Sequence, residues 1–174
     1  MTSRFHVLAI IALCSCFSAC TTMRSSAAHD DLSVIRERGS IHVGVKEQGE
    51  PFGFLLGGQP AGFDVDIAQA IAAAIGVEPV FVPVTSANRI DTLVAGEIDI
   101  IIASMTATRG RDERIDFSIP YFQDGQGLLV PANSSINSYL DLPGKRVGVL
   151  AGSTGEANMA QVAPSAKLVP FPTS

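Results

Sequence analysis

Two kinds of hydrophobic pattern alternate between residues 41 and 103. Residues 41–45 alternate and are rich in β-branched side chains, which is typical of a strand. Residues 63–76 carry apolar side chains at helical spacing and close on a glycine, which indicates a helix. Residues 77–84 read as a second strand, and 98–103 as a third after a short helix that ends at Gly96. This order predicts βαβ units on a mainly parallel sheet, an α/β fold.

Smaller signals refine this outline. Pro79 and Pro83 indicate that the strand 77–84 is either an edge strand or an irregular one, because proline cannot donate a ladder hydrogen bond. The helix at 63–76 is expected to bury a face made of Ile67, Ala70, Ile71, Ala74 and Ile75. The remaining expected elements are a helix at 32–38, a loop or hairpin at 46–59, strands at 125–130 and 147–149, a helical turn at 139–142 and a helix at 156–163.

Composition excludes several classes of protein. The chain has 174 residues, a formal net charge of -5 and 47% hydrophobic residues. It is too apolar to be disordered and large enough for one ordinary domain, or one and a half small ones. The acidic balance, the absence of tryptophan and the lack of a dense Lys/Arg run argue against nucleic acid as a partner.

The N-terminus has the pattern of an export signal. Arg4 precedes an apolar stretch at 5–17 that is of signal-peptide length. The residues before Cys20 are small and resemble the lipobox of bacterial lipoproteins, although Phe17 departs from it; cleavage after Ala28 is the alternative. Either way we expect an exported protein, with a signal peptide or lipobox at 1–20 and a polar tether at 21–30.

All three cysteines lie within this leader, at Cys14, Cys16 and Cys20. The body of the chain therefore has no disulfide framework, no thiolate metal site and no cysteine nucleophile. Asp64 and Asp66 are interpreted as charges at a helix start, where they suit the dipole, and not as a metal pair.

Hydroxyl groups and an arginine follow the strand at 98–103. Ser104, Thr106 and Thr108 come first, and Arg111 comes three residues later. Arginine offers a planar fork of donors that matches a carboxylate, and open α/β sheets bind ligands outside the carboxyl ends of their strands. A solvated charged loop is the alternative interpretation, because Arg109 and other charged residues surround Arg111. The pattern favours a small-molecule binding protein over a catalyst.

Nine short motifs occur in one order along residues 43–155. They are Val43-Gly44-Val45-Lys46, Pro51-Phe52-Gly53-Phe54, Gly62-Phe63-Asp64-Val65-Asp66-Ile67-Ala68, Gly96-Glu97-Ile98-Asp99, Met105-Thr106-Ala107-Thr108, Ile115-Asp116-Phe117-Ser118, Pro120-Tyr121-Phe122, Leu142-Pro143-Gly144-Lys145 and Ala151-Gly152-Ser153-Thr154-Gly155. In this order the chain resembles the family 3 extracellular solute-binding proteins of amino-acid ABC transporters.

The resemblance implies a periplasmic-binding-protein-like fold, in which two α/β lobes grip a ligand between them. Lobe one would span 31–124 and be nearly complete, and lobe two would begin at 125 and be partial over 125–174. The family's chain normally finishes lobe two and returns to lobe one. The truncation is expected at the C-terminus, where that return is missing.

The resemblance also assigns ligand contacts. Arg111 matches the family's clamp on the ligand α-carboxylate, and Ser104 and Thr106 match contacts beside it. Ser153 and Thr154 match lobe-two contacts at a helix N-terminus. The family's ammonium-binding aspartate is not located in this sequence.

Four further positions bear on specificity. Lys46 and Arg89 resemble the basic pair of glutamate/aspartate binders, because a buried second carboxylate needs a paired cation. Ser86 stands where many relatives carry an aromatic residue, and Phe52 is expected either to wall the pocket or to pack at the lobe edge.

The expected function is that of an exported, monomeric receptor that passes a polar amino acid, L-glutamate or L-aspartate, to an ABC permease. Acylation of Cys20 would anchor it to the membrane. No cofactor, metal or catalytic residue is expected. Two alternatives remain: an enzyme of the cyclohexadienyl dehydratase type, with Glu47 as the obvious acid, or the sensing module of a larger receptor.

Overall fold

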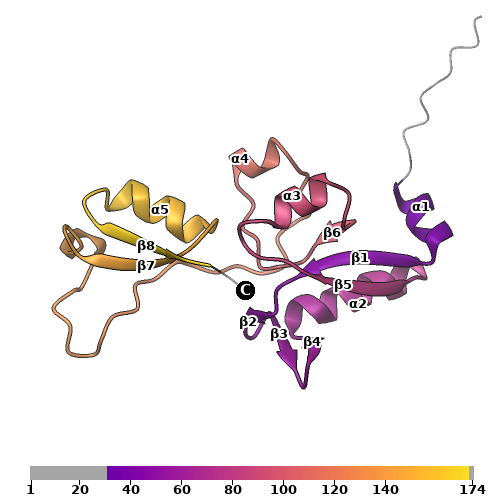
Figure 1. The fold of residues 1–174 in the computed structure, drawn as a ribbon, viewed down its shortest axis with the longest axis horizontal. Helices are drawn as coiled ribbons and strands as arrows, with labels where there is room; N and C mark the ends of the chain where they lie inside the picture. Colours follow the sequence, from indigo (N-terminus) through magenta and orange to yellow (C-terminus); the bar gives the residue numbers. More distant parts are fainter. Residues whose placement is uncertain (1–30, 173–174) are drawn as a thin grey trace, which may run out of the picture. The chain divides into compact units, whose positions relative to one another are not determined.

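A computed structural model describes residues 31–172 of the chain (Figure 1). The predictions for the leader and tether, including Cys20, lie outside the described residues. None of the helices within 31–172 has both the length and the apolar character needed to cross a membrane.

The main sheet has the order β5-β1-β6 and is parallel throughout. Its strands are β1 (Ser40–Val45), β5 (Glu78–Pro83) and β6 (Ile100–Ile101). The connecting helices are α2 (Phe63–Ile75) and α3 (Arg89–Val94), and α1 (Asp31–Arg38) precedes β1. The predicted βαβ arrangement is therefore confirmed, and so is the edge position of β5.

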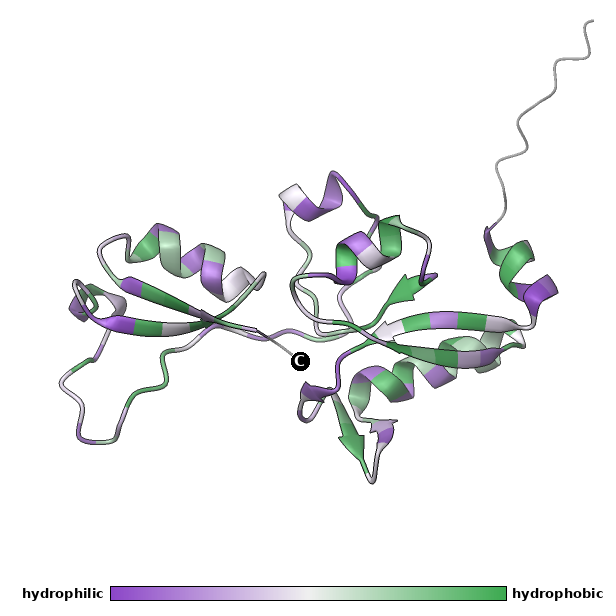
Figure 2. Ribbon diagram, viewed as in Figure 1, coloured by the Kyte–Doolittle hydropathy of each residue, from purple (hydrophilic) through white to green (hydrophobic). Residues whose placement is uncertain are grey.

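The strand predicted at 98–103 is shorter in the structure. Only Ile100–Ile101 pairs as β6. The contact with β1 continues on both sides, because the Asp99 N–H donates to the His42 carbonyl (2.9 Å) and the Ile102 N–H donates to the Gly44 carbonyl (3.0 Å). Figure 2 shows β6 at the hydrophobic end of the scale.

The predicted hairpin at 46–59 is a small antiparallel sheet of β2 (Gln48–Gly49), β3 (Gly53–Leu56) and β4 (Gln59–Ala61). The turn between β3 and β4 uses Gly57 and Gly58, whose φ angles are +61° and +82°. Such angles are easy for glycine and strained for other residues.

A core of apolar side chains lies between α2 and the main sheet. Val43 and Val45 of β1 are 1% exposed. The residues that α2 buries against them are Val65, Ala68 and Ala72, with Ile67, Ile71 and Ile75 partly buried around them. The predicted face was wrong at Ala70 and Ala74, which are exposed. The buried stripe is centred on the small alanines, which let the helix approach the sheet closely.

The later part of the chain forms a second α/β region. It contains η1 (Tyr139–Asp141), β7 (Arg146–Leu150), α5 (Thr154–Val162) and β8 (Lys167–Phe171), and β8 runs parallel to β7. The strand predicted at 125–130 was wrong. These residues find no strand to pair with in the described part of the chain, and Leu129 is fully exposed. A short helix that was not predicted, α4 (Arg109–Asp112), follows β6.

Candidate functional site

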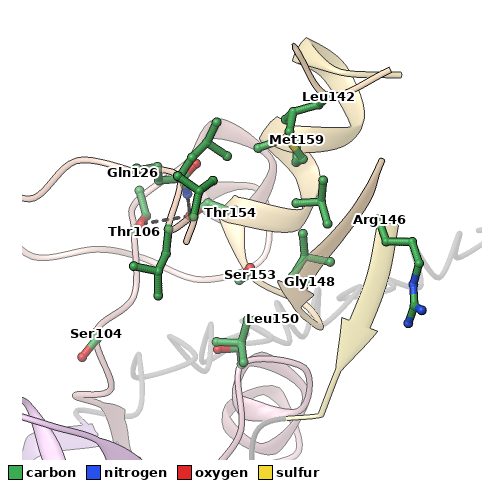
Figure 3. A pocket seen from close by; sticks show the side chains of 18 of the residues that line it. Ser104, Thr106, Gln126, Leu142, Arg146, Gly148, Leu150, Ser153, Thr154 and Met159 are labelled. Atoms are coloured by element: carbon green, nitrogen blue, oxygen red, sulfur yellow. Dashed lines mark hydrogen bonds between the residues drawn. The ribbon is translucent and has the colours of Figure 1, made fainter. Parts of the chain in front are cut away.

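A cavity of about 500 Å³ is lined mostly by residues between 126 and 159, and residues near the carboxyl ends of the main-sheet strands supply the rest. Lys46 follows β1, Ser86 follows β5 and Ser104 follows β6, and all three line it. Further lining residues come from the second region, including Gln126, Ser153 and Thr154 (Figure 3). The structure therefore brings together seven of the predicted contact residues, which are Lys46, Ser86, Arg89, Ser104, Thr106, Ser153 and Thr154.

Arg89 is a buried cation at this cavity. Arg89 is the first residue of α3 and is only 2% exposed. One Nη donates to the Ala103 carbonyl (2.6 Å), whereas Nε has no hydrogen-bond partner within 31–172. Burial, with the nearby Arg111 charge, lowers the pKa of Arg89 to about 10. A buried donor without a partner is costly, so the site favours a group that can accept from it.

Lys46 is a second, half-buried cation at the same cavity. Burial lowers the pKa of Lys46, and the positive charges of Arg89 and Arg111 lower it further. The Asp64 carboxylate acts in the opposite direction. An oxygen-bearing ligand group would relieve the repulsion between these cations.

Asp64 is a buried acid that the sequence interpretation assigned only to the helix start. It is 0% exposed, and its carboxylate accepts from the Ser104 hydroxyl (2.8 Å) and from the Tyr121 hydroxyl (3.0 Å). Burial and this carboxylate raise the pKa of Tyr121. The pairing was missed because Tyr121 is 57 residues away in sequence, and local patterns carry no signal of it.

Ser104 itself has an unusual backbone, with a φ of +48°. Residues other than glycine rarely adopt such angles, and they cluster at functional sites. The conformation turns the chain sharply after β6 while its hydroxyl bonds to Asp64.

Arg111 lies beside the cavity and is not one of its lining residues. Its guanidinium donates to the Thr106 carbonyl (2.8 Å) and to the Gly152 carbonyl (3.1 Å). These bonds hold the loop after β6 against the loop after β7. Burial lowers the pKa of Arg111. Its role as an α-carboxylate clamp stays a prediction.

The two threonines meet at the other side of the cavity. The hydroxyls of Thr106 and Thr154 are 3.4 Å apart, and Thr154 also accepts from the Gln126 amide (3.1 Å), as Figure 3 shows. Asn158 in turn donates to the Gln126 carbonyl (2.9 Å). The sequence interpretation missed Gln126, because it placed that residue in a strand. Ser153 caps α5 by accepting from the Glu156 N–H (3.1 Å).

Two predicted positions lie away from the cavity lining. Phe52 packs edge-on against Phe122, with ring centroids 4.8 Å apart, and against Phe63 at 6.1 Å. The structure therefore places Phe52, which is half-buried, in an aromatic cluster with Phe63 and Phe122 and not in the cavity wall. Glu47, the candidate acid of an enzyme, lines a separate shallow hollow. Within 31–172 no group of three His, Cys, Asp or Glu side chains is arranged to hold a metal ion.

Comparison with known proteins identifies the family. The pattern of the bacterial extracellular solute-binding proteins, family 3, matches residues 41–169. The chain belongs to this family. The resemblance found in the nine motifs is thereby confirmed. This family 3 chain is 39% identical to a glutamine-binding protein of Geobacillus stearothermophilus, over 95% of the chain and 69% of that relative.

A second relative is similar to the same degree. The glutamine-binding protein GlnH of an ABC transporter in Bacillus subtilis (strain 168) is 39% identical, over 95% of the chain and 63% of that protein. The family 3 chain thus spans about two thirds of the length of these relatives.

Solved structures agree on the fold. The ancestral amino acid-binding protein AncCDT-1, a precursor of cyclohexadienyl dehydratase, superposes with a TM-score of 0.78 at 38% identity, covering 81% of this chain and 64% of that one. The chain therefore has the mixed α/β fold of the periplasmic amino-acid-binding proteins, and covers it in part.

Proposed function

We propose that the chain is the exported amino-acid receptor of an ABC transporter, and that it binds an L-amino acid whose side chain ends in an oxygen. The observation that carries this proposal is the pair of cations at the cavity. Arg89 has a buried Nε without a hydrogen-bond partner within 31–172. Burial and the neighbouring cations disfavour the charged form of Lys46 at the same cavity. Both call for an acceptor atom, which a side-chain amide or carboxylate supplies.

Two kinds of ligand meet this requirement, one with an anionic side chain and one with a neutral side chain. Glutamate or aspartate follows from the basic pair alone, since a buried carboxylate needs a cation. Glutamine is favoured by the two relatives described above, both of which are named for binding it. We give glutamine the first place and glutamate the second, because Asp64 already offsets part of the positive charge near Lys46 and Arg89.

The proposal includes the route to the membrane. Residues 1–20 would direct export, and acylation of Cys20 would anchor the monomer, because the residues before it resemble a lipobox. Ligand would be held between the two regions and passed to the permease. Arg111 would meet the ligand α-carboxylate, with Thr106 and Thr154 beside it.

A thermal melt of residues 28–174 with a panel of L-amino acids tests the class of ligand. We expect a cooperative transition that glutamine, and then glutamate, raises by roughly 5–10 °C at saturating concentration. Leucine and lysine are the matched controls, because one lacks an acceptor and the other repeats the positive charge. A transition that no amino acid moves would contradict the proposal.

The same protein serves to test the enzyme alternative, which draws on the likeness to a precursor of cyclohexadienyl dehydratase. Turnover of prephenate or arogenate would favour it. Against it stands the position of Glu47, which does not line the cavity.

Replacing Lys46 with methionine tests the cation at similar volume. We expect Lys46→Met to weaken glutamate binding about tenfold and glutamine binding much less, because only glutamate loses a charge partner. Isothermal titration calorimetry measures both constants. Lys145→Met, in the turn before β7, is the control and should change neither.

The pH dependence has a definite sign. The pKa of Lys46 is lowered from the ordinary 10.5, so its positive charge is lost at a lower pH than that of an ordinary lysine. Glutamate binding should therefore weaken on the alkaline side before an ordinary lysine titrates, while glutamine binding changes less. The readout is the ratio of the two dissociation constants, because the α-ammonium group that both ligands share also titrates on the alkaline side. A ratio that stays constant up to pH 10.5 would contradict the assignment of Lys46.

A further inference from the structure

Asp64 is the one fully buried acid among residues 31–172, and it belongs to no ion pair there. Its carboxylate is fixed from two sides by the Ser104 and Tyr121 hydroxyls, at 2.8 and 3.0 Å. A charge held in this way, without a cation in contact, is costly unless it interacts with other charges at longer range.

The charges it faces are those of the cavity. Lys46 and Arg89 both line the cavity, and the negative charge of Asp64 favours the charged form of each. The groups that act against it are the neighbouring cations, Arg111 included. The negative charge of Asp64 therefore offsets part of the positive charge that Lys46, Arg89 and Arg111 place at and beside the cavity.

The position of Asp64 is set by the surrounding backbone as well. The Asp64 N–H donates to the Phe52 carbonyl (2.8 Å), which ties the start of α2 to the hairpin. Ser104, which holds one carboxylate oxygen, also lines the cavity. The carboxylate is thus fixed in position, and Ser104 lies between it and the cavity.

We propose that Asp64 is a positioning and specificity residue, which offsets the charge of Lys46 and Arg89 and so sets how strongly the site prefers an anionic over a neutral ligand side chain. This inference rests on the proposed function, because it concerns the choice between glutamate and glutamine. Asp64 does not touch the ligand in this scheme; it acts through the two cations and through Ser104.

Asp64→Asn is the direct test, since it removes the charge at nearly constant shape. We expect the ratio of glutamine to glutamate dissociation constants to shift toward glutamate by about tenfold, the effect of one nearby charge. Asp66→Asn is the matched control: it lies in the same first turn of α2 but is exposed, and its ratio should not move. A purely structural role for Asp64 would weaken both ligands equally, and that result would overturn the inference.

A second variant covers the case in which Asp64→Asn does not fold. Tyr121→Phe keeps the ring beside Phe63 and removes only the hydroxyl group, whose donated proton partly cancels the field of the Asp64 carboxylate. We expect the preference between the two ligands to shift toward glutamine, by about twofold to threefold in the ratio of their dissociation constants. A shift toward glutamate in Tyr121→Phe would also overturn the inference.

A titration without ligand separates this inference from the proposed function. The chain has only three lysines, Lys46, Lys145 and Lys167, so the side-chain carbon resonances of Lys46 are readily assigned. Asp64→Asn should lower the pKa of Lys46 and leave the other two unchanged. If the wild type binds no amino acid, the proposed function fails, whereas the titration still decides the charge offset: an unchanged Lys46 would refute it.

Discussion

Arg111→Ala should weaken amino-acid binding by about 100-fold or more, as measured by isothermal titration calorimetry with glutamine. Two of the five N–H groups of Arg111 bond to the Thr106 and Gly152 carbonyls, which leaves three for a carboxylate. Hydrogen bonds to a charged group are worth about 1.5–3 kcal/mol each, and each 1.4 kcal/mol is about tenfold in affinity. Loss of a bidentate contact therefore gives at least this factor.

Arg114→Ala is the control for this substitution. It removes a charge three residues away, whose partner is Asp91 at 2.7 Å on the exposed surface. Exposed pairs contribute little, so binding and stability should stay near the wild-type values. An Arg111→Ala protein that melts cooperatively and binds glutamine with unchanged affinity would refute the clamp role.

Gly62→Ala should destabilise the fold by about 3 kcal/mol or more, which corresponds to a fall in melting temperature of roughly 6–12 °C. Gly62 has a φ of 111° and a ψ of 177°, a region that is essentially restricted to glycine. An added Cβ would also collide with the Phe52 carbonyl and lie 2.8 Å from the Pro51 oxygen. Because those carbonyls accept from the first N–H groups of α2, the clash would displace the helix start.

Gly76→Ala, at the other end of the same helix, is the matched control. Its φ of +76° is also positive, but an added Cβ would meet nothing within 4 Å. We expect only the conformational cost, about 1–2 kcal/mol. Equal melting temperatures for the two variants would show that the close approach at Gly62 does not matter.

Much of the fold could be predicted because its signals are local. Pro79 and Pro83 favour an edge strand because proline cannot donate a ladder hydrogen bond. Gly76 ends α2 because it adopts the left-handed conformation of a helix C-cap. The strand expected at 125–130 failed for a non-local reason. A strand needs a neighbouring strand with which to exchange hydrogen bonds, and the sequence of residues 125–130 does not show whether such a neighbour is present.

The candidate site divides in the same way. Ser104 was predicted from its place after a parallel strand, since strand ends meet at one edge of a sheet, and Lys46 and Ser86 were predicted from the family resemblance. Phe52 was expected either to wall the pocket or to pack at the lobe edge, and the structure packs it against Phe63 and Phe122. Gln126 joined the site through bonds to Thr154 and Asn158, which lie about thirty residues further on.

The sequence by itself determined the α/β class, the family and the set of polar residues at the strand ends, because helical and strand periods and ordered motifs are properties of the chain. Only the tertiary structure decided how those residues are charged and held. From the sequence Asp64 is an ordinary acid at a helix start, whereas in the structure it is buried and accepts hydrogen bonds from Tyr121 and Ser104. Burial and the charges of neighbouring residues shift the pKa values of Lys46 and Arg89, and both causes depend on positions in space that no local pattern encodes.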